Sequence, residues 1–482
     1  MSITVSSFLA ALEKNQDLFI YRQSADVSGE TACAIVKQGL TKYLAVMGDC
    51  AAFDGELQGE IKLCPLSVKN AQALHALFPY TKPASHAKHP FTVGLGDRLG
   101  LATPGHVKAI AGYNAYPVLA QQSIRELTLT NRTFEEVIAA ATFGVFQEGY
   151  KGGYGADGDH LKTTEEIQYA LNAGCTMITL DCSAHINTAA AFYDDAQLNA
   201  EYAQLPEEIR SAYESRYLGR SLPVIGEISA MELKRIVLVF YKAVIHAQSC
   251  YRFIEEIKTT DVDFEMSIDE TRTITSPAEH FVIASELLGC GVKPISMAPH
   301  FSGEFEKGIE YSGNLADFAR DFEMHQKIAE HFGYKLSVHS GSDKFSVFSM
   351  VGRFTGCHVH VKTAGTNWLE AMRVVAKHNP ALYRKAHKFA LEHRAEAEKY
   401  YHVSTNPADI PNIDLQNDAF LPEYLEIPAS RQSLHIAYGL LLNEKWFAEE
   451  FFSFMAARED DYYAGLVNHI GRHLRYLTAE RK

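Results

Sequence analysis

The sequence predicts an α/β protein built on a closed (β/α)8 barrel. Apolar segments recur along the middle of the chain, each followed by a polar turn and then a helix with a 3.6-residue apolar period. At least six to eight such units fit between residues 88 and 370, and strands that alternate with helices predict a parallel sheet. This number of units favours a closed barrel over an open, doubly wound sheet. No GxGxxG or GxxxxGK[ST] turn follows a predicted strand, which argues against a nucleotide-binding fold.

Six strand segments are visible in the sequence. They are Phe91–Gly96, Cys175–Leu180, Phe264–Ile268, Val292–Ala298, Lys335–Val338 and Cys357–Val361. Proline at a favoured first-turn position predicts helices that begin near Pro104 and Pro277. Another helix is bounded by Asn314 as its N-cap and Gly333 as its stop.

The flanks of the barrel have a different character. Residues 1–87 carry mixed strand and helix signals and predict an N-terminal α/β cap region. Residues 88–370 form the predicted catalytic barrel. Residues 371–482 predict a helical C-terminal extension that packs on the barrel or on a neighbouring subunit, so a homo-oligomer stays open.

Composition limits the partners. The 482 residues are 47% hydrophobic and 22% charged, with a formal net charge of −14. This charge argues against nucleic acid and anionic membrane as general partners, although a local basic cluster can still bind a small anion. The sequence has no apolar run of about 20 residues and no basic, apolar leader. The lack of both segments predicts a cytoplasmic protein. The eight cysteines lack any CxxC pair, which predicts reduced thiols.

The segment from Gly155 to Thr164 places an acid beside an imidazole, Asp159 and His160, on what the sequence predicts to be a loop entering a helix. Thr163 is the predicted N-cap, and Glu166 lies three residues later as in a capping box. The pair would thus sit where a strand passes into a helix, which is where α/β barrels keep their chemistry.

Polar residues at the carboxyl ends of barrel strands converge on one mouth. Here they are Asp97, Asp159, His160, Asp181, Glu270, Glu306, His339, Asp343 and Lys362. Two histidines with one or two carboxylates suit a catalytic divalent ion such as Zn, Mn, Co or Ni. His300 is an alternative ligand to Glu306. Structural roles are expected for His358 and His360, which alternate along one strand.

Eight sequence blocks carry a resemblance to a known family. They are Gly96–His106, Gln122–Thr128, Gly155–Thr163, Thr179–Ser183, Ile268–Thr271, Phe305–Gly308, His339–Phe345 and Val361–Thr366. In this order they resemble the tagaturonate epimerase family over nearly the whole chain. A weaker resemblance, through the Gly-Asp-His-Leu turn and the Leu-Asp strand end, reaches the metal-dependent tagatose-bisphosphate aldolase group. These resemblances imply a barrel fold, one divalent ion and functional roles for Asp159 and His160.

The family resemblance implies an epimerase that interconverts D-tagaturonate and D-fructuronate, two keto-uronates of hexuronate breakdown. We expect metal-assisted inversion at the carbinol next to the ketone, by deprotonation and reprotonation or by a retro-aldol route. An alternative is a metal-dependent aldolase or lyase acting on a phosphorylated keto sugar. A non-catalytic partner subunit is a third hypothesis, which the full set of acidic and histidine residues at the mouth disfavours.

Roles are assigned on this basis. His160, Glu306 and His339 are the predicted metal ligands. Asp159 is the predicted proton acceptor, and Glu270 the donor on the opposite face, with Glu265 as the alternative second group. Ser123, Asp181 and Lys362 are predicted to hold the hydroxyl groups and the carboxylate of the sugar.

Overall fold

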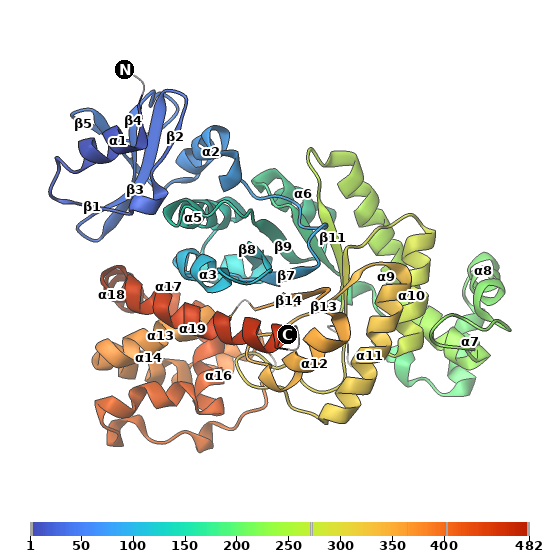
Figure 1. The fold of residues 1–482 in the computed structure, drawn as a ribbon. Coiled ribbons are helices and arrows are strands. Elements are labelled where there is room, and N and C mark those ends of the chain that lie inside the picture. Colours follow the sequence, from blue (N-terminus) through green and yellow to red (C-terminus); the bar gives the residue numbers. More distant parts are fainter. Residues whose placement is uncertain (1–2, 270, 272, 364, 402, 480–482) are drawn as a thin grey trace.

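Eight parallel strands close into a barrel at the centre of the molecule (Figure 1). The computed structural model describes residues 3–269, 271, 273–363, 365–401 and 403–479. The barrel strands are β7 (Phe91–Gly94), β8 (Tyr116–Ser123), β9 (Gly155–Leu161), β10 (Met177–Asp181), β11 (Asp263–Ile268), β12 (Ser296–Pro299), β13 (Lys335–Val338) and β14 (Val359–Lys362). β14 pairs with β7 in parallel, from Val359 opposite Phe91 to Lys362 opposite Gly94, and this pairing closes the ring. The predicted (β/α)8 fold class is confirmed.

Helices follow the strands around the outside of the barrel. They are α3 (Thr103–Ile110), α4 (Ile124–Thr130), α5 (Phe134–Gln147), α6 (Thr164–Ala173), α9 (Ala230–Ile257), α10 (Pro277–Gly289), α11 (Leu315–Phe332), α12 (Phe345–Thr355) and α13 (Thr366–His378). As predicted, Asn314 caps the start of α11 and Gly333, in the left-handed region, ends it. Between β10 and α9 the chain makes an excursion through α7 (Asp195–Ala203) and α8 (Glu207–Tyr217), which projects at the right of Figure 1.

The acidic segment around Asp159 is part of strand β9, and the prediction of a loop there was wrong. The strand runs through Leu161, and a bulge interrupts its pairing with β10, between the pairs Gly158–Ile178 and Leu161–Leu180. Thr163 is the N-cap of the next helix, as expected, and accepts a hydrogen bond from the backbone N–H of Glu166. A bulge bends its strand and redirects side chains, which brings polar residues of β9 to the mouth.

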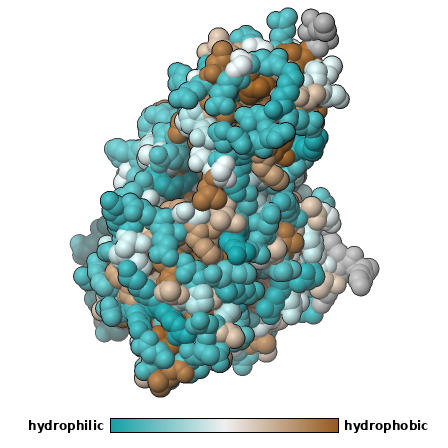
Figure 2. Space-filling model, turned by 90° about the vertical axis from the view of Figure 1, so that its left-hand side faces the viewer, coloured by the Kyte–Doolittle hydropathy of each residue, from teal (hydrophilic) through white to brown (hydrophobic). Residues whose placement is uncertain are grey.

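The N-terminal region forms a separate antiparallel sheet that packs on the barrel. Its elements are α1 (Val5–Leu12), β1 (Leu18–Ile20), β2 (Asp26–Ser28), β3 (Thr31–Gln38), β4 (Thr41–Gly48), β5 (Glu56–Gln58), β6 (Ile61–Pro65) and α2 (Val68–Leu77). Ile35 and Leu44 of this sheet share one core cluster with Phe143 and Phe146 of α5. The region forms the upper lobe in Figure 2, where the visible face is mostly hydrophilic with small apolar patches.

The C-terminal helices form a second core beside the barrel. After α13 come α14 (Pro380–Glu392), α15 (Arg394–Ala397), α16 (Pro428–Ile436), α17 (Tyr438–Asn443), α18 (Lys445–Ala457) and α19 (Glu459–Thr478). Trp368 packs there against Phe447 and Phe451. Helix α19 returns to the barrel and lies against α3, α12 and α13. The domain boundaries at residues 87 and 370 remain predictions. None of the described helices is long and apolar enough to cross a membrane.

Candidate active site

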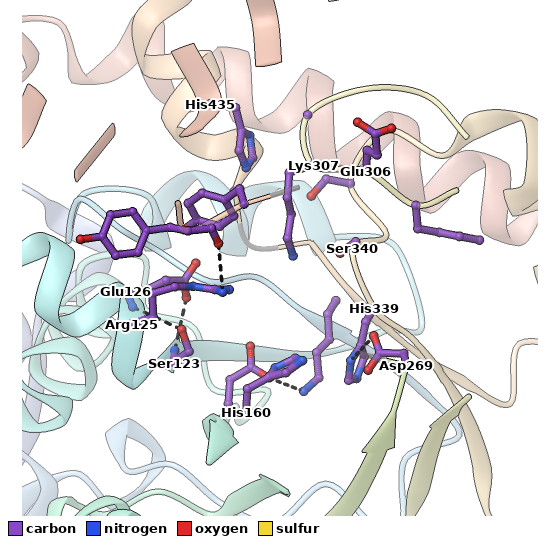
Figure 3. A pocket seen from close by; sticks show the side chains of 18 of the residues that line it. Ser123, Arg125, Glu126, His160, Asp269, Glu306, Lys307, His339, Ser340 and His435 are labelled. Carbon is purple, nitrogen blue, oxygen red and sulfur yellow. Dashed lines mark hydrogen bonds and ion pairs between the residues drawn. The ribbon is translucent and has the colours of Figure 1, made fainter. Parts of the chain in front are cut away.

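A polar cavity of about 310 Å³ lies at the carboxyl ends of the barrel strands (Figure 3). Barrel strands and the residues that follow them supply its floor, including His160, Asp269 and His339. The segment after β12 and the C-terminal helices cover it, with Lys307 and His435 directed inward. The cavity therefore combines the predicted catalytic face of the barrel with the C-terminal extension.

His160 is directed into the cavity by local backbone geometry. It occupies the β9 bulge with φ of 55°, in the left-handed region that few residues other than glycine adopt. Its Nδ1 lies 2.8 Å from Oδ1 of Asp159. An ionised carboxylate only accepts hydrogen bonds, so Nδ1 carries the proton and Nε2 of a neutral ring presents a lone pair. Burial lowers the pKa of His160, but the Asp159 carboxylate outweighs it and raises this pKa overall.

His339, which follows strand β13, lies between two carboxylates. Its Nε2 lies 2.7 Å from Oε1 of Glu265, whose side chain is fully buried. Its Nδ1 lies 3.2 Å from Oδ2 of Asp269. Burial lowers the pKa of His339, but Asp269 and Glu265 outweigh it and raise this pKa to about 10. If Nε2 donates to Glu265, a neutral ring turns the lone pair of Nδ1 toward a carboxylate oxygen. Such a pair of acceptors needs a proton or a cation between them.

His160, Asp269 and His339 form a group suited to a metal ion. One ligand atom from each lies within 4.8 Å of the others. Two imidazoles and a carboxylate match the donors that Zn and similar divalent ions take in catalytic sites, with positions left for substrate. Asp159 contacts Nδ1 of His160, and Glu265 contacts Nε2 of His339, which leaves the other nitrogen of each ring for an ion. Many metal-bound histidines have a carboxylate on the nitrogen that does not bind the metal. This donor set, with Nδ1 of His339 facing a carboxylate oxygen of Asp269, fits a divalent ion.

Lys362 lies beneath this group in a buried cluster of charges. Its Nζ lies 2.7 Å from Asp159, 2.9 Å from Asp157 and 3.0 Å from Glu265. Burial opposes its charge, but the three carboxylates raise the pKa of Lys362 well above its usual value. Burial likewise opposes ionisation of Asp159, yet Lys362 and His160 hold the pKa of Asp159 well below its usual range. The floor therefore carries more carboxylates than cations, which favours a bound divalent ion.

The opposite wall of the cavity is cationic. Arg98 pairs with Glu126 at 2.6 Å, and its guanidinium lies 4.0 Å from the ring centroid of Tyr438. The guanidinium of Arg125 lies 4.8 Å from the ring centroid of Tyr401. Lys307 points into the cavity between these groups and His339 (Figure 3). The cavity thus has a cationic end and an end with histidines and carboxylates.

The structure brings some of the predicted ligands together. His160 and His339 lie in the metal-suited group, but Glu306 does not, because its carboxylate accepts hydrogen bonds from the backbone of Ser404 and the side chain of Gln432. Asp269 completes the group instead. It was not among the predicted ligands, although it directly follows the predicted strand Phe264–Ile268. His300 lines the cavity outside this group.

The other predicted residues have varied positions. Asp159 lines the cavity, and Ser123, at its edge, caps α4. Asp181 does not line the cavity and instead lies 3.1 Å from Nζ of Lys162. Lys362 lines the cavity, but its charge is already opposed by carboxylates. Glu270, the predicted proton donor, lies outside the described residues.

A second group of possible ligands, Asp343, His469 and His473, is engaged within the protein. Nε2 of His473 accepts a hydrogen bond from the backbone N–H of Asp343 at 2.9 Å. Asp343 also pairs with Arg431 of α16. These contacts tie the segment after His339 to the C-terminal helices, which is a positioning role.

A closed parallel barrel with a polar cavity at the carboxyl ends of its strands defines a class: the (β/α)8 barrels whose functional site lies at this face. Comparison with known proteins places it further. The model of the tagaturonate epimerase family (UxaE) matches residues 21–477. The tagaturonate/fructuronate epimerase of Thermotoga maritima is 37% identical over 469 residues, which cover 95% of this chain and 96% of that protein.

Solved structures agree with the sequence match. The native crystal structure of fructuronate-tagaturonate epimerase from Cohnella laeviribosi has a TM-score of 0.95 at 48% identity. A glycerol complex of the same enzyme also has a TM-score of 0.95, and both cover 98% of this chain and 99% of theirs. The chain belongs to the tagaturonate epimerase family and is an isomerase. The resemblance predicted from the sequence blocks is confirmed.

Proposed function

We propose that this protein interconverts D-tagaturonate and D-fructuronate with the help of one divalent ion held by His160, Asp269 and His339. The observation that carries the proposal is a cavity with a metal-suited group at one end and a cationic wall at the other. A keto-uronate has a ketone near one end and a carboxylate at the other, so its charges match this polarity. The reaction belongs to hexuronate breakdown, and eight free cysteines support a cytoplasmic location.

The chemistry of the substrates favours the retro-aldol route. Sugars of the fructose and tagatose series differ at C4, whereas the ketone is at C2. The inverted carbinol is therefore separated from the ketone by C3, and the expectation that it lies next to the ketone was wrong. The ketone acidifies the hydrogen on C3 but not the one on C4. The C3–C4 bond, however, is in the position that an aldol reaction forms and breaks.

In this route a base takes the proton of the C4 hydroxyl, and the electrons of the C3–C4 bond move to C3 and the ketone oxygen. C4 becomes an aldehyde, turns about the C4–C5 bond and is attacked by C3 on its other face. The proton then returns to the C4 oxygen. A divalent ion supplies stabilisation of the negative charge on the ketone oxygen.

Asp159 is the retained candidate for the base, through Oδ2, which accepts only a 3.3 Å hydrogen bond from Gln121 among the described residues. The low pKa of Asp159 makes it a weak base. Its contacts therefore support a role in orienting His160 more strongly than a role as the base. Glu270 and Glu265 remain the two candidates for the second proton-transfer group. Glu265 is fully buried behind His339, which supports a role through that ring.

The test is metal-reconstituted protein with D-tagaturonate in D2O, followed by NMR. The retro-aldol route predicts D-fructuronate without deuterium at C4, and traces of dihydroxyacetone and 2-hydroxy-3-oxopropanoate when the aldehyde is trapped. Deuterium at C4 would instead require direct removal of that hydrogen. Absence of fructuronate with Zn, Mn, Co and Ni alike would refute the proposed function.

A further inference from the structure

We infer that Lys307, together with His435, forms the subsite that binds the substrate carboxylate and so selects uronates over neutral ketoses. This inference rests on the proposed function and assigns the charged end of the substrate to the wall facing His160, Asp269 and His339. Among the residues predicted from the sequence to hold the hydroxyl groups and the carboxylate, Ser123, Asp181 and Lys362, only Lys362 is a cation.

Lys362 is poorly suited to a substrate carboxylate because its charge is already committed. Its Nζ contacts Asp157, Asp159 and Glu265, all within 3.0 Å. Only 3% of its side chain is exposed. A fourth carboxylate at this position would be repelled by three existing ones.

Lys307 has the opposite environment. Its ammonium makes no ion pair or hydrogen bond with any residue that the structure describes, although it lines the cavity. Burial lowers the pKa of Lys307, Arg125 and Arg98 act in the same direction, and the charges of Glu126 and Asp159 only partly offset this effect. A half-buried ammonium without a contacting carboxylate is costly, and an anionic ligand would remove that cost.

His435 is a second, independent sign of a ligand at this end. Its side chain is 1% exposed, lines the cavity, and has no hydrogen-bond partner on either nitrogen within the described parts of the chain. Burial, with Arg98 and Lys307 nearby, holds its pKa well below the usual value, so the ring is neutral and one nitrogen carries a hydrogen. Buried polar atoms nearly always have a hydrogen-bond partner. Two ring nitrogens without one, at the edge of a cavity, therefore point to a polar group of a bound ligand.

The position of Lys307 is held by its backbone rather than by its side chain. Gln432 donates to the carbonyl of Lys307, Arg431 to that of Gly308, and Lys344 to that of Glu306. Three side chains thus fix the backbone from which Lys307 reaches into the cavity. Replacing the Lys307 side chain should therefore leave the segment in place.

The experiment compares Lys307→Met with Lys307→Arg, and uses Lys327→Met, an exposed lysine of α11 paired with Glu323, as the matched control. For Lys307→Met we expect kcat/KM for D-tagaturonate to fall about 30- to 1000-fold, as for loss of a buried charge pair. KM should rise, Lys307→Arg should recover most of the loss, and the control should match the wild type. The melting temperature of Lys307→Met should equal or exceed that of the wild type.

Binding is measured separately by calorimetry with D-gluconate and its uncharged counterpart D-glucitol. Lys307→Met should weaken D-gluconate at least 30-fold and leave D-glucitol unchanged. Equal loss for both ligands, or unchanged affinity and kcat/KM for the acids, would overturn the inference. If the wild type does not convert tagaturonate, the proposed function fails, and the binding of D-gluconate alone decides the role of Lys307.

Discussion

Nζ of Lys362 and Oδ1 of Asp159 lie 2.7 Å apart, and the same oxygen accepts a hydrogen bond from His160. The lysine therefore fixes the carboxylate that orients a metal-suited histidine. It also offsets the mutual repulsion of Asp157, Asp159 and Glu265 inside the barrel. One buried cation thus supports both the stability of the barrel and the geometry of its site.

Lys362→Met should destabilise the protein and abolish turnover. Removing one partner of a buried ion cluster leaves uncompensated charge and costs about 3–5 kcal/mol. Urea unfolding measures the effect, with Lys69→Met as control, since its pair with Asp54 is exposed and such pairs contribute at most about 1 kcal/mol. A loss for Lys362→Met no larger than that of the control would contradict this account of the cluster.

Asp269→Asn and Glu306→Gln distinguish the two candidates for the third metal ligand. We expect Asp269→Asn to reduce bound metal to below about a tenth of the wild-type amount, since a catalytic site of three protein ligands would lose one. Glu306→Gln should keep full metal content because Glu306 contacts Ser404 and Gln432 instead. His339→Ala should lose both metal and turnover.

Metal per chain is measured by mass spectrometry after reconstitution and dialysis, with circular dichroism to verify folding. The reverse pattern, with metal lost in Glu306→Gln and kept in Asp269→Asn, would restore Glu306 as the ligand. Full metal and activity in His339→Ala would remove His339 from the site.

The barrel could be predicted from sequence because most of its strands are short apolar runs between amphipathic helices. Strands β8 and β9 escaped this pattern. β9 consists of Gly155 to Leu161 and faces the barrel interior with Asp157 and Asp159, which Lys362 neutralises. Because the interior there is filled by an ion cluster, the hydrophobic signal of a buried strand is missing.

Only the part of the site that lies at the carboxyl ends of the barrel strands could be predicted, because these ends converge on one mouth. His160 near the end of β9 and His339 directly after β13 meet because the barrel closes, which the fold class implies. The placement of Asp269 in this group depends on the course of the backbone after β11, which spacing does not reveal. The position of Glu306 depends on Gln432, which is 126 residues away and belongs to the C-terminal helices.

Glu265→Gln should weaken metal binding without removing a ligand. Glu265 lies behind Nε2 of His339, and loss of such an outer carboxylate commonly costs 10- to 100-fold in metal affinity. Competition with a chelator measures the dissociation constant of the metal. Glu286→Gln is the control, since this carboxylate of α10 pairs with Tyr217 instead. Unchanged metal affinity in Glu265→Gln would show that His339 does not depend on this contact.

His473→Gln should make stability less sensitive to acid. Burial, with the neighbouring His469, lowers the pKa of His473 to about 3, against about 6.5 in the unfolded chain. The unfolded state therefore binds the proton first as pH falls, so the stability present above pH 6.5 decreases between about pH 6.5 and 3. For one such histidine the loss from pH 7.5 to 5.5 is about 1.4 kcal/mol. Protonation of Nε2 would also place its hydrogen against the backbone N–H of Asp343, which donates to that nitrogen in the neutral ring.

Urea unfolding at pH 7.5 and 5.5 measures the loss of unfolding free energy on acidification. This loss should be smaller by about 1.4 kcal/mol in His473→Gln than in the wild type, with His378→Gln, a more exposed histidine, as the control. An equal pH dependence in wild type and His473→Gln would mean that His473 is not the buried neutral group described here.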